Sequence, residues 1–388
     1  MRQFFIFVSV AMVTLLFPVH ASFAQAELMS DTVTLMKARV MAIEKEEARP
    51  VEGTGATHSF QTIRVKILDG EEKGKVITVE NDYFNLDEGE TFYLMHTVDQ
   101  YSGLDFYMVN DPYRLPQLFF LVGLFVFIVF IFGGKQGMRG LASLVGSFLF
   151  IFYVLLPGIM HGYSPLLITV AVSSLIIILG SYITHGFTRT TSAAVLGMIF
   201  TVTLTGLFAY WAVRMTRLSG FGSEEIVYLN LNAGGSIDVI GLLLGGIIIG
   251  LLGVLYDAAI GQSVSVEELT RIAPHVPRKT IYQRALRIGR EHIGALVNTL
   301  AIAYVGASLP LLLLFYQTSS GTLGRIINTE IFATEIVRIM IGSIGLVLAV
   351  PITTFVSVLM LVKKPEKEVS AHTLSEETEA LKHTNHKH

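Results

Sequence analysis

The chain has 388 residues, of which 52% are hydrophobic and only 15% are charged, and its formal net charge is −3. Soluble domains carry roughly a quarter charged residues. This composition and several apolar runs of about 20 residues therefore predict a multi-pass membrane protein, with the lipid bilayer as its first partner. The near-neutral charge argues against a nucleic-acid partner, and the absence of cysteine excludes disulfides, thiolate metal sites and cysteine catalysis.

Residues 1–26 combine Arg2, an apolar run from Phe4 to Val19 and small residues at Ser22, Ala24 and Ala26. This pattern is typical of a secretory signal peptide. An uncleaved N-terminal anchor helix is the alternative, and either interpretation places the next segment outside the cell.

Residues 30–112 contain short runs that alternate apolar and polar side chains, separated by turn signals such as Asp69-Gly70 and Ser102-Gly103. Five or six such strands in about 80 residues predict a small antiparallel barrel, SH3-like or OB-like, as an extracytoplasmic domain. His58 and His96 are interpreted as half-exposed strand residues rather than ligands.

Residues 115–362 are predicted to form a bundle of about seven transmembrane helices, with a basic turn over residues 133–139 and a short surface helix within the loop 214–236. A retained N-terminal anchor would make eight spans. Residues 363–388 are predicted to be a disordered tail. The expected spans are residues 118–132, 141–156, 165–184, 192–213, 237–256, 293–315 and 335–362.

The orientation follows from the distribution of Lys and Arg. The segments around Lys135, Arg189 and residues 271–290, together with the tail, hold most of these residues, whereas the opposite connections hold few. By the positive-inside rule, these basic segments and the tail are cytoplasmic in a bacterial plasma membrane, and the β domain is outside.

The first part of residues 241–269 (GLLLGGIIIGLLGVLYDAAIGQSVSVEEL) is predicted to be the central helix of the bundle. It runs without a break into an acidic, hydroxyl-rich segment that begins the longest predicted connection, residues 257–292. The helix contains glycines at short intervals, including two pairs that are four residues apart. Small residues at this spacing allow close approach of neighbouring helices in lipid. The predicted helix-packing positions are Gly241, Gly245, Gly246, Gly250 and Gly253.

Several motifs of the membrane part resemble the YibE/F-like family of bacterial multi-pass membrane proteins. They include residues 134–141 (GKQGMRGL), 184–191 (THGFTRTT), 247–253 (IIIGLLG) and 288–300 (IGREHIGALVNTL). Tyr256 stands where the family often has Met. The resemblance covers nearly the whole chain and supports the bundle outline, but it implies no particular activity, substrate or cofactor.

Ionisable groups at membrane depth are costly, so those near span ends are candidates for a substrate or ion pathway. Asp257 is the expected acceptor or proton carrier, with Arg189 or Arg290 as its counter-charge, and His185 or His292 as the group that titrates near neutral pH. A simple interfacial anchor at Asp257 is the alternative. The full set of candidates is His185, Arg189, Asp257, Gln262, Ser263, Arg290, Glu291, His292 and Asn298.

Other polar and proline positions have structural interpretations. Glu335 and Arg338 are predicted to form an ion pair three residues apart, and Asp238 is predicted to start a helix. Pro310 and Pro351 are expected to kink the sixth and seventh spans. No ligand spacing supports a metal site, and no cofactor is predicted.

Two functions remain open. The first is a transporter or permease for a small solute or ion. The second is a non-transporting scaffold or sensor that binds envelope and cytoplasmic partners. No nucleotide-binding, serine-hydrolase or zinc-protease fingerprint occurs in a credible context, so we do not expect an enzyme, and no catalytic residue is assigned. A homo-oligomer is compatible with the sequence.

Overall fold

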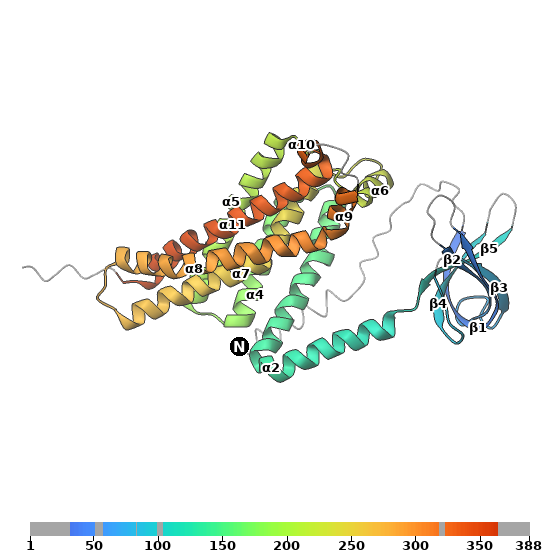
Figure 1. The fold of residues 1–388 in the computed structure, drawn as a ribbon. Coiled ribbons are helices and arrows are strands. Elements are labelled where there is room, and N and C mark those ends of the chain that lie inside the picture. The colour runs from blue at the N-terminus through green and yellow to red at the C-terminus, as the bar shows by residue number, and fades with distance from the viewer. Residues whose placement is uncertain (1–31, 51–56, 83, 99–103, 318–322, 364–388) are drawn as a thin grey trace, which may run out of the picture. The chain divides into compact units, whose positions relative to one another are not determined.

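The computed structural model describes residues 32–50, 57–82, 84–98, 104–317 and 323–363 (Figure 1). It divides into two compact units, Met1–Ile131 and Phe132–His388. The predicted signal segment, residues 1–26, and residues 364–388 of the predicted tail lie outside the described residues.

The first unit contains a curled antiparallel sheet in the order β3-β2-β1-β4-β5 (Figure 1). Alternate side chains point inward, as the period of a strand dictates, and bury Ile63, Val65, Phe92 and Leu94 in one core. The predicted all-β domain is confirmed as a curled five-stranded half-barrel, while its SH3-like or OB-like assignment stays a prediction. The strands are β1 (Thr32–Pro50), β2 (Thr57–Ile67), β3 (Val76–Asn81), β4 (Thr91–Val98) and β5 (Asp105–Pro112).

Three side chains connect the β2–β3 turn to β5. Lys75 Nζ donates to Glu72 Oε1 at 2.7 Å and to the Tyr107 hydroxyl at 3.0 Å, and that hydroxyl donates to Glu72 Oε2 at 2.8 Å. The hydrogen bond from Lys75, followed by that from Tyr107, lowers the pKa of Glu72. The same bond to Glu72 raises the pKa of Lys75 above its ordinary value. Ionised Glu72 and Lys75 therefore stabilise the approach of the two sheet edges.

The rest of the chain is helical, and α2 crosses the boundary between the two units. Five helical segments are long and apolar enough to cross a membrane: Leu115–Met160, α4, α5, α7 and α11. The elements are α2 (Leu115–Phe150), the π-helix η1 (Ile151–Leu155), α3 (Leu156–Met160), α4 (Pro165–His185), α5 (Arg189–Thr216), α6 (Glu224–Asn232), α7 (Val239–Ile272), α8 (Arg278–Ala307), α9 (Leu309–Gln317), α10 (Leu323–Ile327) and α11 (Glu330–Leu361).

Seven spans therefore stay a prediction. The first two expected spans lie in one continuous segment, Leu115–Met160. The expected sixth span is divided at Ser308, which follows the end of α8, and Pro310 lies in the first turn of α9 rather than in a helix interior. The expected surface helix in the loop 214–236 is present as α6. Pro351 lies inside α11, as predicted.

A single glycine interrupts α2. Gly134 has φ 50° and ψ −141°, whereas the residues on both sides are helical. A side chain is strained at this positive φ, so glycine is favoured at this interruption of the helix. The predicted basic turn over residues 133–139 is thus reduced to one residue, because Lys135, Gln136 and Arg139 continue the helix.

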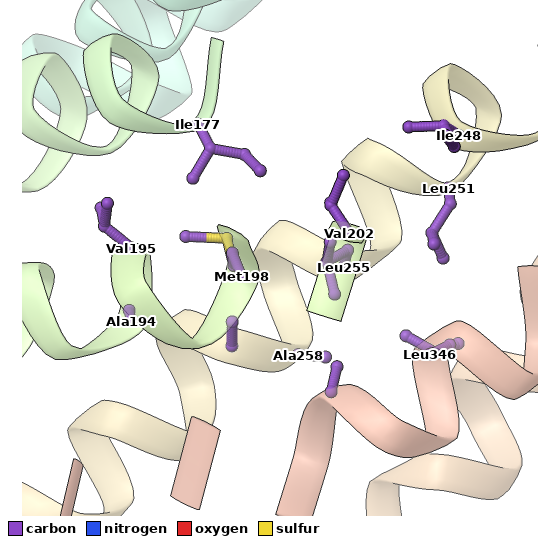
Figure 2. Close-up of a cluster of buried hydrophobic side chains, with 12 residues drawn as sticks. Ile177, Ala194, Val195, Met198, Val202, Ile248, Leu251, Leu255, Ala258 and Leu346 are labelled. Atoms are coloured by element: carbon purple, nitrogen blue, oxygen red, sulfur yellow. The ribbon is translucent and has the colours of Figure 1, made fainter. Parts of the chain in front are cut away.

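Helices α4, α5, α7 and α11 pack around one apolar cluster (Figure 2). Glycines bring these helices close together: a Cβ added to Gly197 would lie 2.8 Å from Thr353 Cα, and one added to Gly245 would lie 2.7 Å from Thr169 Oγ1. Close backbone contact of this kind drives helix association in lipid. The largest side chains of the cluster are Ile177, Val195, Met198, Val202, Ile248, Leu251, Leu255 and Leu346.

The five glycines assigned to packing on α7 fall into two groups. Gly241 and Gly245 are buried against Pro165 and Thr169, and the Tyr304 hydroxyl of α8 lies against Gly250. Gly246 and Gly253 have no atom within 4 Å of an added Cβ. The packing prediction is therefore wrong for these two within one chain, because both lie on the exposed side of α7.

The longest connection predicted from the sequence, residues 257–292, is not a loop. Helix α7 continues to Ile272 and α8 begins at Arg278, so only residues 273–277 connect them. Pro274 and Pro277 explain this turn, because proline cannot continue α7 and favours the first residues of α8. At about 51 Å, α7 is longer than the roughly 30 Å hydrocarbon core of a bilayer. This length is more than one perpendicular crossing of a bilayer requires.

Arg278 holds the last turn of α11. Its Nε donates to the Val362 carbonyl at 2.9 Å, and its Nη2 donates to the Leu359 carbonyl at 3.3 Å. The final carbonyls of a helix lack hydrogen-bond donors within the helix, and the Arg278 guanidinium provides donors for two of them. The start of α8 is thereby joined to the end of α11.

Candidate functional site

A polar pocket lies where α4 ends and α5 begins. Gly186 ends α4 with φ 79°, and Thr188 caps α5 by accepting a 3.0 Å hydrogen bond from the Thr191 N–H. Helix α7 passes this junction and supplies the opposite wall. We call this the His185 pocket. Its volume is about 210 Å³, and it is lined by His185, Thr188, Thr190, Thr191, Ile260, Ser263, Val264 and Glu267.

The chemistry of the His185 pocket suits a small polar occupant. Hydroxyl groups can donate and accept hydrogen bonds, the imidazole of His185 can do both, and the Glu267 carboxylate is an acceptor. The N-terminus of α5 adds a partial positive charge beside them. At about 30 Å³ per water molecule, the volume holds several waters or one small solute.

Behind the pocket, two hydrogen bonds join α7 to α11. Ser263 Oγ lies 2.7 Å from Ser357 Oγ, and Thr354 Oγ1 donates to Gln262 Oε1 at 2.8 Å. All four side chains are buried. Gln262 also lies against Gly289 of α8, where an added Cβ would be 2.5 Å from its Nε2. A polar layer thus reaches from the pocket into the packed interior.

His185 is exposed at the pocket entrance. Its ring centroid lies 5.8 Å from that of Tyr256 on α7, whose hydroxyl donates to the Gly180 carbonyl at 3.3 Å. Gln136 Nε2 of α2 donates to the Thr184 carbonyl at 3.1 Å. The end of α4 is therefore held from α7 and from α2.

Of the nine candidates that the sequence suggested, the structure places His185 and Ser263 in the pocket, and Gln262 directly behind it. Asp257 lies on the exposed side of α7 and has neither an ion pair nor a side-chain hydrogen bond within the described part of the chain. The expected Asp257–Arg pair is therefore not formed. The nearest residues along this exposed side are Gly253 and Gly261.

The remaining candidates lie elsewhere. Arg189 is exposed at the start of α5. Gly289 of α8 touches Gln262, but no α8 residue is in the described lining of the His185 pocket. The structure does not bring these α8 side chains together with Asp257: Arg290, Glu291, His292 and Asn298 are all exposed. Among the described residues, no three His, Asp or Glu side chains are close enough to hold a metal.

The other end of the bundle confirms two structural predictions. Asp238 caps α7 by accepting a 2.9 Å hydrogen bond from the Gly241 N–H. Glu335 and Arg338 form an ion pair at 3.0 Å. Tyr304 lies within electrostatic range of both, and its buried hydroxyl has no hydrogen-bond partner in the described residues.

Glu330 joins the start of α11 to the loop after α5. Its Oε1 accepts from the Ser219 N–H at 2.7 Å, the Gly220 N–H at 3.0 Å and the Ser219 hydroxyl at 3.0 Å. Three donors on one carboxylate oxygen, with Gly220 at φ 87°, make this a specific junction.

Sequence reasoning missed several members of the site. Thr188 could have been found as an N-cap before an apolar run, and Glu267 as the residue one turn beyond Ser263 on the same helix face. Ser357 and Thr354 had no local signal, because their partners are more than 90 residues away in the chain.

Comparison with known proteins gives one match. A family model described as "YibE/F-like protein" matches residues 121–363. This range contains every element of the His185 pocket. No curated protein and no solved structure matches the chain.

Proposed function

The chain belongs to the YibE/F-like family, and we propose that it is a permease that moves a small polar solute or ion across the bacterial plasma membrane. In this proposal the bundle has seven spans, with α2 contributing two of them around Gly134. The sheet, with its proposed SH3-like or OB-like character, is outside, and the His185 pocket opens to the cytoplasm. No catalytic step is proposed.

The observation that carries the proposal is the buried polar layer behind the pocket. Hydrogen bonds between such side chains contribute to helix association in lipid, but polar groups at membrane depth are costly. Here Gln262, Ser263, Thr354 and Ser357 line the packed interface between α7 and α11. Their position directly behind an open pocket supports a route by which a polar solute enters the bundle.

Further polar groups support the route beyond this layer. Thr201 and Thr205 are fully buried on α5, and Tyr304 has its unpartnered hydroxyl farther along the bundle. Hydroxyls bonded within their own helix, such as Thr205 to the Thr201 carbonyl at 2.8 Å, can exchange that bond for one to a passing solute. We therefore propose that these hydroxyls replace water around the solute.

The orientation is supported by charge. Arg284, Arg287 and Arg290 lie exposed on the half of α8 near the His185 pocket. Basic residues of this kind favour the cytoplasmic side. Because the chain has no cysteine, single cysteines at Thr78 and Lys279 should react with an impermeant reagent from the outside and from the inside, respectively.

The function is tested by reconstitution. The purified protein is first screened for thermal stabilisation by simple ions and common metabolites, and stabilising solutes are then measured for uptake into proteoliposomes. Protons and Na⁺ serve as standard probes. Ser263→Val should abolish uptake, whereas Ser265→Val, two residues away and bonded to its own helix through the Gly261 carbonyl, should retain it.

A second pair of variants tests the effect of the carboxylate charge in the pocket on uptake. Glu267→Gln should reduce uptake, whereas Glu268→Gln should not, because Glu268 is occupied by an ion pair with Arg271 at 2.6 Å. If no probe moves and no solute stabilises the protein, the permease proposal fails. The scaffold or sensor alternative would then be pursued by crosslinking through the sheet.

A further inference from the structure

The outward face of the β-sheet is polar on one half and apolar on the other. On β2 and β3, the register pairs Thr62 with Glu80 and Arg64 with Thr78, and these side chains point away from the core. On β1, β4 and β5, two rows run across three strands in register. One row is Leu35, Met95 and Met108, and the other is Val33, Thr97 and Phe106.

These two rows form what we call the apolar face. Val33 is 55% exposed, Leu35 59%, Phe106 49% and Met108 54%. Single exposed apolar residues are ordinary, but these lie next to one another on adjacent strands, with Thr97 as the one polar member of the two rows. Contiguous apolar patches of this kind mark interaction surfaces. The opposite, inward side of the same strands already holds the core. The apolar face is therefore not needed to fold the sheet.

A cationic and aromatic band borders the apolar face. Along the same strands, the next rows pair Lys37 with Tyr93 and Arg39 with Thr91. The Tyr113 ring packs edge-on against Tyr93 at 5.6 Å, and Lys37 Nζ lies 4.8 Å from the centre of the Tyr113 ring. Neither Lys37 nor Arg39 is in an ion pair within the described residues.

Two acidic residues beside this band already have partners. Asp111 forms an ion pair with Arg114 at 2.9 Å, and Asp69 Oδ1 accepts a hydrogen bond from the Lys37 backbone N–H. The band therefore presents positive charge and tyrosine next to exposed aliphatic and aromatic side chains. This order, from apolar to aromatic to basic, is the order in which side chains meet the acyl boundary, interface and phosphates of a membrane surface.

We propose that the apolar face of the sheet binds the surface of the lipid bilayer. Its apolar side chains would enter the boundary between headgroups and acyl chains, while Lys37 and Arg39 would contact lipid phosphates. The chain itself favours this partner, because β5 ends at Pro112 and the apolar helix α2 begins at Leu115. A sheet tethered this closely to a span meets lipid at high effective concentration, so modest affinity suffices.

Other occupants fit less well. A protein partner for an outward-curving face would itself have to provide a groove, and its contacts with Lys37 and Arg39 would require carboxylates. Lipid phosphates supply the matching charge without a dedicated partner. The inference concerns only the sheet, and it stands whether or not the helical unit transports a solute.

The test uses the full chain and its lack of cysteine. Thr97→Cys places one thiol in the middle of the apolar face, and Thr78→Cys places a matched thiol on the polar half. Each variant is labelled with bimane and reconstituted into liposomes. Quenching is measured with a lipid carrying a doxyl group near its headgroup, and with iodide on both sides of the membrane.

The label at residue 97 should be quenched by the doxyl lipid and protected from iodide, and the label at residue 78 should show the reverse. Adding Phe106→Glu and Met108→Glu to the Thr97→Cys protein should remove the lipid quenching while the helical unit melts unchanged. Equal iodide quenching at both positions would overturn the proposal. A label at residue 97 hidden from both quenchers would also overturn it, in favour of a protein partner or a second copy.

Discussion

Gln61 and Asn81 are polar side chains buried in the sheet unit, and both have their hydrogen bonds satisfied. Asn81 Nδ2 donates to Gln61 Oε1 at 3.0 Å, Gln61 Nε2 donates to the Leu86 carbonyl at 3.1 Å, and the Leu86 N–H donates to Gln61 Oε1 at 2.9 Å. In the described residues, every buried side-chain polar atom without a partner belongs to the helical unit instead. Examples are Thr169, Ser173 and Thr353.

Under the permease proposal, this difference separates a structural unit, the sheet, from the unit that carries the solute. Buried polar groups in stable domains are nearly always paired, because an unpaired group loses its bonds to water without compensation. The sheet follows that rule. The helical unit retains hydroxyls that can still accept or donate a hydrogen bond, and those of Thr169 and Ser173 lie on α4, the helix that ends at the His185 pocket. Four predictions test whether this contrast has the energetic meaning that we give it.

The largest effect is expected from breaking the satisfied network of the sheet. Gln61→Ala leaves the N–H and the carbonyl of Leu86 without their side-chain partner, and the Asn81 amide keeps only its bond to the Phe84 carbonyl. The change should lower the free energy of unfolding of the sheet by about 3 kcal/mol. Urea unfolding is followed with bimane on Thr78→Cys. The neighbouring Thr62→Ala should cost little, and equal effects of the two changes would contradict the network's role.

The next effect tests close packing in the helical unit. Gly197→Ala forces a Cβ against the Thr353 backbone and should destabilise the bundle by about 2 kcal/mol, seen as a lower melting temperature in detergent. Gly253→Ala has open space and should leave the melting temperature unchanged or slightly raised, since alanine favours helix. A similar loss in both proteins would refute the packing that we describe between α5 and α11.

A smaller effect distinguishes paired from unpaired hydroxyls. Ser357→Ala removes the bond to Ser263 and should cost about 0.6 kcal/mol, the average for such bonds between membrane helices. Ser173→Ala removes an equally buried hydroxyl that has no partner. This change should be neutral or stabilising in the same melting assay. If Ser173→Ala were the more damaging change, the contrast between the units would be lost.

The smallest effect is the pH dependence of the sheet. The pKa of Glu72 is lowered from 4.5 in the folded state by Lys75 and Tyr107, so its contribution is present above pH 4.5 and is lost as the pH falls through the lower folded value. The pKa of Lys75 is raised from 10.5, so its contribution is lost only in strong alkali. The urea concentration at the unfolding midpoint should therefore decrease as the pH is lowered below 4.5.

Glu72→Gln provides the control for this pH dependence. It should lower the urea midpoint at pH 7 and flatten the dependence on acid. An unchanged acid profile would show that other carboxylates determine it.

Local patterns were sufficient for much of the fold. Alternating side chains identified the strands, and apolar length identified α4, α5, α7 and α11. The prediction failed where a charged segment was interpreted as a loop. Residues 257–292 are polar, but they contain no proline before Pro274, so the helix can continue that far. The result is two long helices with a short turn.

The site was less accessible to prediction. His185, Gln262 and Ser263 were identified because polar residues at span ends are unusual. Asp257 was given the same weight, but which side of α7 faces the bundle depends on how α4, α8 and α11 pack around it. The pairing of Ser263 with Ser357 depends on that same tertiary register, which no spacing in the sequence encodes.

The most direct test of the central claim is to block the His185 pocket during transport. Val264→Cys places the only thiol of the chain in the pocket wall. Uptake of the stabilising solute, or of protons or Na⁺, is then measured before and after modification with a charged methanethiosulfonate reagent. Gly253→Cys, on the exposed side of the same helix, is the matched control. Modification should stop uptake through Val264→Cys and leave uptake through Gly253→Cys unchanged. Undiminished uptake through fully modified Val264→Cys would contradict the account.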